Sequence, residues 1–263
     1  MSVIERTPYE ACPLCGDEAI LDIGTYDCTR HPLYHPPLPP TISWCECYRC
    51  HHVFTDGYFE GSAAAEVMSR VSPSQVPGNA PHRDARWRAV VDRVGACCSR
   101  PGGEWLDVGF GDGSLLQTAQ NAGFAVSGID LRQESVERLA RLGIPARRAA
   151  LESLEEQARY AVISLADVLE HMPFPRPALE QARRLLAPLG ILFVSLPEFG
   201  SLAWKELDGR RSNPYWTEIE HYHNFSRPHL EEVLRQTNFE PLWHHPNGRY
   251  LCGLDVAARR VAS

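Results

Sequence analysis

Apolar and polar residues form two kinds of segment along the last two thirds of the chain. Short apolar runs have the length of buried strands, and the segments between them carry apolar residues at helical spacing. The predicted strands are residues 105–109, 125–130, 146–149, 160–165 and 190–196. The predicted helices are residues 114–122, 132–142 and 177–187. Strands that alternate with helices predict an α/β fold, a doubly wound and mostly parallel sheet covered by helices.

The end of the chain predicts one more helix and a hairpin. Ser226 is a suitable N-cap and Pro228 suits the first turn, so a helix is expected at residues 226–237. Two apolar runs follow at residues 239–245 and 249–257, joined by Pro246, Asn247 and Gly248. Asn-Gly between apolar runs favours a hairpin, so we expect the seven-stranded sheet to end in an antiparallel pair.

The beginning of the chain has a different composition. Residues 1–59 are rich in Cys, His and Pro, and the prolines between residues 32 and 40 exclude a helix there. Residues 60–101 read as a connector, with a helix marked by Trp87, Val90 and Val94 at helical spacing. We therefore predict a small lobe at 1–59, this connector, and a main domain at 102–263.

Composition excludes several classes of protein. With 44% hydrophobic and 22% charged residues the chain is typical of a globular protein, and no apolar run is long enough for a membrane span. A net charge of −7 argues against a nucleic-acid partner, which attracts basic surfaces. The first residues lack a basic segment followed by an apolar one, so we expect no secretory signal and a cytoplasmic location.

Six of the nine cysteines lie in the predicted lobe, and four of them form two CxxC pairs. Cys12, Cys15, Cys47 and Cys50 would supply four thiolates, which is the closed tetrahedral set of a structural, zinc-ribbon-like site. The alternative is four buried free thiols. Other residues that remain open as ligands nearby are Cys45, His51 and His52, and a separate group is Cys28, His31 and His35.

A glycine-rich loop follows the first predicted strand. It runs from Asp107 to Gly113, with Gly109 and Gly111 between, and such a loop lets a ligand approach the backbone and a helix N-terminus. Asp130 ends the next strand about 20 residues later, where a carboxylate accepts ribose hydroxyls. A tight turn with a surface Asp is the alternative.

The residues after Gly113 decide between two nucleotide ligands. A dinucleotide-binding loop has a third glycine or alanine for close packing, whereas Ser114, Leu115 and Leu116 follow here. This weakens the NAD interpretation, so an NAD-dependent oxidoreductase is kept as an alternative.

From about residue 105 onward the chain resembles the class I S-adenosylmethionine-dependent methyltransferases. The resemblance rests on the glycine loop, on Asp130, on residues 164–171 and 185–192, and on the terminal hairpin. It implies that Asp107 and the loop glycines hold the methionyl end of the cofactor. It also implies that Asp130 binds the ribose, that Leu131 belongs to the cofactor site and that Asp167 lies beside the sulfonium, while Glu152 or a backbone amide is the candidate for the adenine.

The paired cysteines extend this resemblance to the N-terminus, because some sugar C-methyltransferases and related small-molecule enzymes begin in the same way. The resemblance implies methyl transfer to a small-molecule acceptor in specialised or sugar-related metabolism, with structural Zn²⁺ in the lobe. The sugar enzymes carry a further domain after the core that this sequence lacks, so the acceptor is not carried over. A catalytically inactive zinc-containing binding protein is the second alternative, and the sequence indicates no oligomeric state.

Two groups of residues are candidates for chemistry. Asp167, Glu170 and His171 follow the fourth strand; similar residues bind a divalent cation in some quinone O-methyltransferases but line the cofactor elsewhere. Glu220 and His221 precede the last helix and resemble an element that faces the methyl donor. We expect His221, supported by Glu220, to accept a proton, with His171 as the next candidate and helix capping as the alternative. The aromatic residues expected to line the acceptor pocket are Phe199, Trp204, Tyr215 and Trp216.

Overall fold

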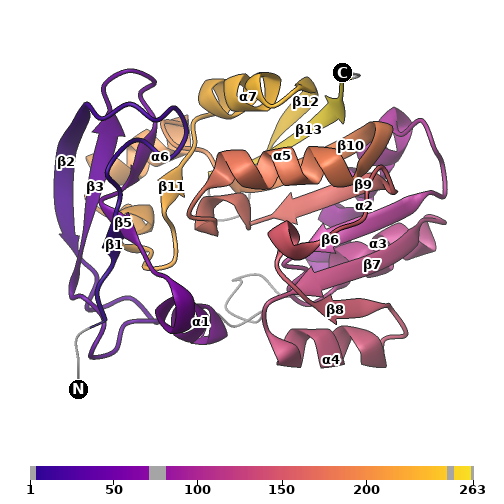
Figure 1. Cartoon of the computed structure of the whole chain (residues 1–263), viewed down its shortest axis with the longest axis horizontal. Coiled ribbons are helices and arrows are strands. Elements are labelled where there is room, and N and C mark those ends of the chain that lie inside the picture. The colour runs from indigo at the N-terminus through magenta and orange to yellow at the C-terminus, as the bar shows by residue number, and fades with distance from the viewer. Residues whose placement is uncertain (1–3, 71–80, 248–251, 262–263) are drawn as a thin grey trace.

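The computed structural model describes residues 4–70, 81–247 and 252–261 (Figure 1). Its main element is a seven-stranded sheet in the order β12-β13-β10-β9-β6-β7-β8. The five parallel strands are β6 (Glu104–Val108), β7 (Ala125–Asp130), β8 (Ala146–Arg148), β9 (Tyr160–Ala166) and β10 (Leu186–Pro197). The antiparallel pair at the edge is β12 (Phe239–Asn247) and β13 (Gly253–Arg260). The predicted fold class is confirmed.

Helices cover both faces of this sheet because alternate strand residues point to opposite sides. Leu106 and Val108 of β6 belong to the core beneath α5 (Pro175–Leu185) and α7 (Arg227–Gln236). Trp105, the residue before Leu106, points to the other face and belongs to the opposite core. The helices on that side are α2 (Pro81–Cys97), α3 (Ser114–Asn121) and α4 (Gln133–Arg141).

The hairpin is confirmed, but its connection differs from the one expected at Asn247 and Gly248. Pro246 and Asn247 still lie in β12 and pair with Leu254 and Gly253, so β13 begins later than predicted. Gly248 lies outside the described residues. The fifth strand begins at Leu186 rather than at residue 190, with an irregularity in its pairing before Ile191.

The N-terminal lobe is a four-stranded antiparallel sheet that the sequence did not predict. Its order is β11-β4-β3-β2, with β2 (Ile20–Asp27), β3 (Thr41–Cys47), β4 (Val53–Thr55) and β11 (His223–Asn224). A shorter pair joins β1 (Thr7–Pro8) to β5 (Gly57–Tyr58). Because β11 comes from a distant part of the chain, the lobe sheet is completed by the segment that carries His221. The division at residues 59 and 101 stays a prediction.

The lobe packs on the connection between β10 and α7. Two helices were not predicted. Helix α1 (Gly61–Arg70) follows the lobe, and helix α6 (Leu202–Gly209) follows β10. Trp44 of β3 donates its indole N–H to the Trp216 carbonyl at 2.9 Å, and Tyr26 stacks on the Trp216 ring. These contacts bring the lobe against the carboxyl edge of the main sheet. None of the described helices has the length and apolar character that a membrane span requires.

Candidate active site and metal site

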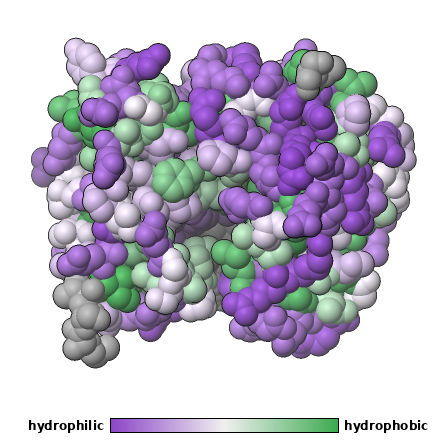
Figure 2. Space-filling view, viewed as in Figure 1, coloured by the Kyte–Doolittle hydropathy of each residue, from purple (hydrophilic) through white to green (hydrophobic). Residues whose placement is uncertain are grey.

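A cavity of about 930 Å³ lies between the lobe and the carboxyl ends of β6, β7 and β9. Figure 2 shows the surface hollowed between these two halves of the molecule. The lining includes the loops after those three strands, most of the residues between 214 and 222 but not Trp216, and lobe residues Asp27 and 30–33. This is the edge at which doubly wound sheets bind ligands.

The three loop glycines have different surroundings although all have positive φ, at 63°, 57° and 80° for Gly109, Gly111 and Gly113. A Cβ at Gly111 would meet nothing within 4 Å, and Gly111 lines the cavity. A Cβ at Gly109 would lie 2.8 Å from Val168. Gly113 does not line the cavity; it is the N-cap of α3, and a Cβ there would lie 2.5 Å from Leu139.

Asp130 lies at the end of β7 and is held by Arg132, which the sequence analysis did not single out. Its Oδ1 accepts hydrogen bonds from the Arg132 backbone N–H (2.8 Å) and Nε (3.0 Å), and its Oδ2 from Nη2 (2.9 Å). A carboxylate has about four acceptor positions. One position on Oδ2 is left for a ribose hydroxyl, and a second hydroxyl would displace an Arg132 contact. Leu131, next to Asp130, is 52% exposed and lines the cavity.

Asp107 of β6 lines the cavity as an almost fully buried carboxyl group. Ser164 of β9 donates its hydroxyl to Oδ1 at 2.5 Å. Burial raises the pKa of Asp107 to about 7, against the lowering effect of this hydrogen bond. A cationic group at this position would favour the ionised form.

The remaining expected cofactor residues also line the cavity, namely Asp167, with a φ of 54°, and Glu152. Three features of the cavity suit a ligand that joins a nucleoside to an amino acid. They are the open space beside Gly111, the Asp130 carboxylate at the end of β7 and the carboxyl group of Asp107. The residues expected to hold that ligand therefore lie around one cavity, with Gly113 placed behind the loop.

His171 and His221 also line the cavity, with ring centroids 4.7 Å apart and rings nearly perpendicular. The His171 Nδ1–H donates to the Glu220 backbone carbonyl at 2.9 Å, so the lone pair of the ring lies on Nε2. Nδ1 of His221 is buried without a hydrogen-bond partner. Burial lowers the pKa of both histidines, most strongly that of His221, so both rings are neutral near pH 7.

The Glu220 carboxylate does not support His221 as expected. It is turned toward His31 of the lobe, 3.9 Å away, and its pKa is raised to about 7 by burial and by Glu218. Within the described part of the chain no hydrogen bond joins the Glu220 side chain to the His221 ring. The backbone turns here, with the His221 N–H donating to the Glu218 carbonyl at 3.3 Å, and the two side chains meet different neighbours, His31 and His171.

The residues that converge as a possible cation group also differ from those expected. Glu170, His171 and His221 have ligand atoms within 4.8 Å of one another, and His221 takes the place that was expected for Asp167. Tyr215 lines the cavity, as expected. The other three expected aromatic residues lie outside the lining and pack on one another, namely Phe199, Trp204 and Trp216.

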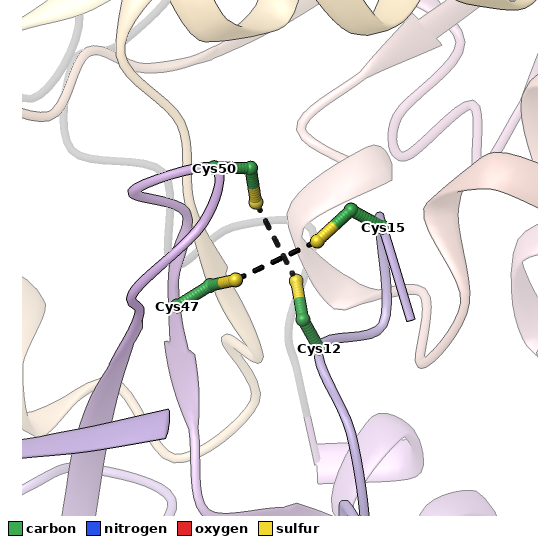
Figure 3. A group of neighbouring side chains, drawn as sticks. All are labelled: Cys12, Cys15, Cys47 and Cys50. Atoms are coloured by element: carbon green, nitrogen blue, oxygen red, sulfur yellow. Dashed lines mark hydrogen bonds between the residues drawn. The ribbon is translucent and has the colours of Figure 1, made fainter. Parts of the chain in front are cut away.

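The four cysteine thiols converge as predicted (Figure 3). Cys12 lies 3.6 Å from Cys50 and Cys15 lies 3.5 Å from Cys47, measured between sulfurs. A tetrahedral zinc with bonds of about 2.3 Å places its sulfurs about 3.8 Å apart, and these two separations are close to that value, with all four sulfurs within 4.8 Å of one another. Each CxxC turn is closed by a 2.9 Å hydrogen bond, from Gly16 N–H to the Cys12 carbonyl and from His51 N–H to the Cys47 carbonyl.

The other expected ligands point elsewhere. The ring of His51 contacts Glu46 at 2.8 Å, and His52 contacts His223 at 3.0 Å. Neither residue belongs to the cysteine cluster, and neither does Cys45. The second group is also divided, because Cys28 donates to the Pro39 carbonyl, His31 contacts Glu218 and His35 contacts Glu66.

Comparisons with known proteins identify the family of the main domain. A family model described as a methyltransferase domain matches residues 80–244. The ubiquinone biosynthesis O-methyltransferase of Klebsiella pneumoniae is 32% identical over 126 residues, which are 43% of this chain and 51% of that protein. The corresponding protein of Actinobacillus pleuropneumoniae is 32% identical over 102 residues, 34% of this chain and 44% of that protein. The chain thus spans about half the length of these curated relatives.

Solved structures share the fold. A Pyrococcus horikoshii protein superposes with a TM-score of 0.57 and 14% identity, over 73% of this chain and 98% of that one. Magnesium protoporphyrin IX methyltransferase of Synechocystis, solved with bound SAH, gives a TM-score of 0.56 and 18% identity over 68% of this chain and 83% of that one. At these identities the likeness is one of fold.

Proposed function

The chain belongs to the methyltransferase domain family, and we propose that it transfers a methyl group from S-adenosylmethionine to a small-molecule acceptor in specialised or sugar-related metabolism. The observation that carries the proposal is the cavity itself. Its lining combines the open glycine loop, Asp107 and Asp130 with two neutral histidines and residues of the lobe. A donor and an acceptor would therefore lie in one cavity.

The residues around the cavity act mainly by position. S-adenosylmethionine, when bound, supplies an electrophilic methyl group on a sulfonium sulfur. We assign the ribose to Asp130 and Leu131, the methionyl end to Asp107, Gly109 and Gly111, and the vicinity of the sulfonium to Asp167. Buried groups held in place before the ligand arrives lower the entropy that is lost on the way to the transition state.

His221 accepts the acceptor's proton in this proposal, and His171 is the second candidate. Both rings are neutral near pH 7 and line the same wall of the cavity. The hydrogen bond from His171 to the Glu220 carbonyl fixes the orientation of that ring against His221. A neutral imidazole can take a proton from a hydroxyl, an amine or an activated carbon.

The four cysteines hold a structural Zn²⁺ in this proposal, because four thiolates leave no open position for catalysis. Two of the hydrogen bonds between the metal lobe and the main domain lie next to the segments that hold the cysteines and α5. Arg176 of α5 donates to the Leu14 carbonyl at 2.8 Å, and the Tyr9 hydroxyl donates to the Pro173 carbonyl at 2.7 Å.

Calorimetric binding of S-adenosylhomocysteine and NAD tests the cofactor, and release of S-adenosylhomocysteine across an acceptor panel tests turnover. Asp130→Ala should weaken binding by about 1.5–3 kcal/mol, the value of a charge-assisted hydrogen bond. Arg132→Ala is the matched control because it breaks the same ion pair and leaves the carboxylate in place. Tighter binding of NAD, or equal losses in the two variants, contradicts the assignment.

A further inference from the structure

A second group of polar side chains lies in the cavity, between the lobe and the segment before β11. His31 Nε2 lies 2.8 Å from Glu218 Oε2 and 3.9 Å from Glu220 Oε2. All three residues line the cavity. Only 9% of the His31 side chain and 11% of the Glu220 side chain are exposed, so the group is largely shielded from bulk water.

The hydrogen bonds of His31 fix what the ring can do. The Leu33 backbone N–H donates to Nδ1 at 3.3 Å, so Nδ1 acts as an acceptor and the ring proton lies on Nε2. That proton is donated to Glu218. A metal ion bound at Nε2 would need the opposite tautomer, with an Nδ1–H facing the Leu33 N–H. The arrangement therefore favours a histidine that orients Glu218 over a histidine that ligates a metal.

Glu220 has a buried carboxyl oxygen that lacks a hydrogen-bond donor. Its Oε2 is buried without a hydrogen-bond partner, and the residue is 9% exposed. Arg6 lies nearby but donates to the carbonyls of Gly57 and Ile219. Among the described residues no ion pair joins Arg6 to Glu220. A single histidine thus faces two carboxyl groups, and Glu220 Oε2 has no hydrogen-bond partner within the group.

We propose that Glu218 and Glu220 form a subsite for a protonated amino group on the acceptor, with His31 as the residue that positions Glu218. The proposal rests on the proposed function and adds the chemical class of the acceptor. A hydroxyl group would give Glu220 its missing hydrogen bond but would leave two carboxylates sharing one histidine. An ammonium group supplies several donors and the missing positive charge at once. It would also favour the ionised form of Glu220, whose pKa is raised to about 7 by burial and Glu218.

Ligand-observed NMR with benzylamine and benzyl alcohol tests this subsite without a known acceptor. The two probes share their shape but differ in charge at about pH 8, where Glu220 is ionised. We expect the full-length protein to bind benzylamine at least about tenfold more tightly than the alcohol. Glu220→Gln and Glu218→Gln should each reduce this preference. Asp27→Asn is the matched control, because Asp27 also lines this cavity and its carboxylate is exposed. This variant should keep the preference within about twofold.

The role of His31 has its own comparison. His31→Ala should reduce the preference for benzylamine, and His31→Gln, whose amide can also donate to Glu218, should restore it. Circular dichroism reports whether each variant folds, and if Glu220→Gln does not fold, Glu218→Gln decides. Equal binding of both probes, or a preference that survives both glutamate changes, overturns the subsite.

The same samples separate this proposal from the proposed function. The probes are titrated with and without S-adenosylhomocysteine, so that a failure of cofactor binding leaves the result on the subsite standing. Cofactor binding without a preference for the amine contradicts only the subsite. A Mn²⁺ equivalent that is bound by the zinc-loaded protein and lost in Glu220→Gln would replace the ammonium with a divalent cation and overturn the proposal.

Discussion

Asp107 lies one residue before the end of β6. Burial disfavours the ionised form of its carboxyl group, which is the form that would attract a cationic ligand. The Ser164 hydroxyl is its hydrogen-bond donor, and its pKa is raised by burial to about 7. Below that pH the group is protonated and loses its negative charge. The affinity for S-adenosylhomocysteine, whose amino group is cationic, should therefore fall by up to about tenfold per unit as the pH drops from 7 to 5. Calorimetry across this range measures the slope.

Asp107→Asn provides the control for this pH dependence and adds a stability measurement. The amide keeps an oxygen for Ser164 but carries no charge, so the variant should bind weakly at every pH. In the parent, the folded-state pKa lies above the unfolded value, so the group's contribution to stability is present at low pH and is lost as the pH rises through about 7. At about pH 8 the variant should therefore melt at a higher temperature than the parent. A lower melting temperature with unchanged affinity contradicts the assignment.

Variants of His221 and His171 distinguish a role in catalysis from a role in folding. His221→Ala should keep S-adenosylhomocysteine affinity while turnover falls by about 100- to 10,000-fold, the usual contribution of a general base. Burial holds the pKa of both rings below the ordinary histidine value, so turnover should not decline as the pH falls from 8 toward 6.5 on account of either ring. Initial rates of S-adenosylhomocysteine release measure both effects. If His221→Ala keeps near-parental turnover and only melts earlier, His221 is a structural residue and His171→Ala becomes the deciding variant.

The glycine loop between β6 and α3 combines two tasks that mutations can separate. Gly111 and Gly113 both have positive φ, so alanine costs about 1–2 kcal/mol at either position. At Gly113 the new methyl would also lie 2.5 Å from Leu139, so the free energy of unfolding should fall further, by about 2–4 kcal/mol in total. At Gly111 the methyl would enter open space beside the cavity, so the larger effect should be on cofactor affinity. Urea denaturation and calorimetry of the two variants give these values, and a reversed order contradicts the division of roles.

Strand β11 connects the two sheets of the molecule. His223 pairs with Phe54 and Asn224 with Val53 of β4, and the backbone of Tyr222 accepts from Thr55 N–H at 2.9 Å. The residues just before β11 carry Glu220 and His221. The lobe and the loop that carries Glu170 and His171 therefore hold these two residues between them, since the Tyr222 N–H also donates to the Glu170 carbonyl.

Because β11 belongs to the lobe sheet, we expect the cysteine cluster to affect both the stability and the turnover of the whole molecule. The purified protein should contain about one zinc per chain, and Cys47→Ser should remove it, because three thiolates bind zinc far less tightly than four. The melting temperature and turnover should both fall, since a loosened lobe sheet no longer holds β11. Cofactor affinity should stay within about threefold, because the glycine loop and Asp130 belong to the main sheet.

Cys97→Ser is the matched control for this experiment, because Cys97 is a free thiol at the end of α2, outside the cluster. Metal analysis, thermal unfolding and calorimetry report the three quantities. Unchanged zinc content and melting temperature in Cys47→Ser would remove the metal site from the proposal. An equal loss in Cys97→Ser would show that the effect is not specific to the cluster.

The sequence by itself determined the main sheet, the glycine loop and the cysteine cluster. Each of these depends on local order: apolar runs of strand length between helical segments, glycines directly after a strand, and two CxxC turns that each hold their own pair of thiols. The seven-stranded sheet has the predicted strands, and the four sulfurs converge as their spacing indicated.

Tertiary structure decided the rest, because it depends on segments that meet only after folding. Pairing β11 with β4 required a partner distant in sequence, and no periodicity in two residues announces such a strand. The contact of Arg132 with Asp130 and the position of Gly113 behind its loop depend on side-chain packing. Glu220 and His221 are neighbours in sequence, but Glu220 lies toward His31 of the lobe and His221 toward His171. Which side chains share the acceptor end of the cavity was therefore fixed by the docking of the lobe on the sheet.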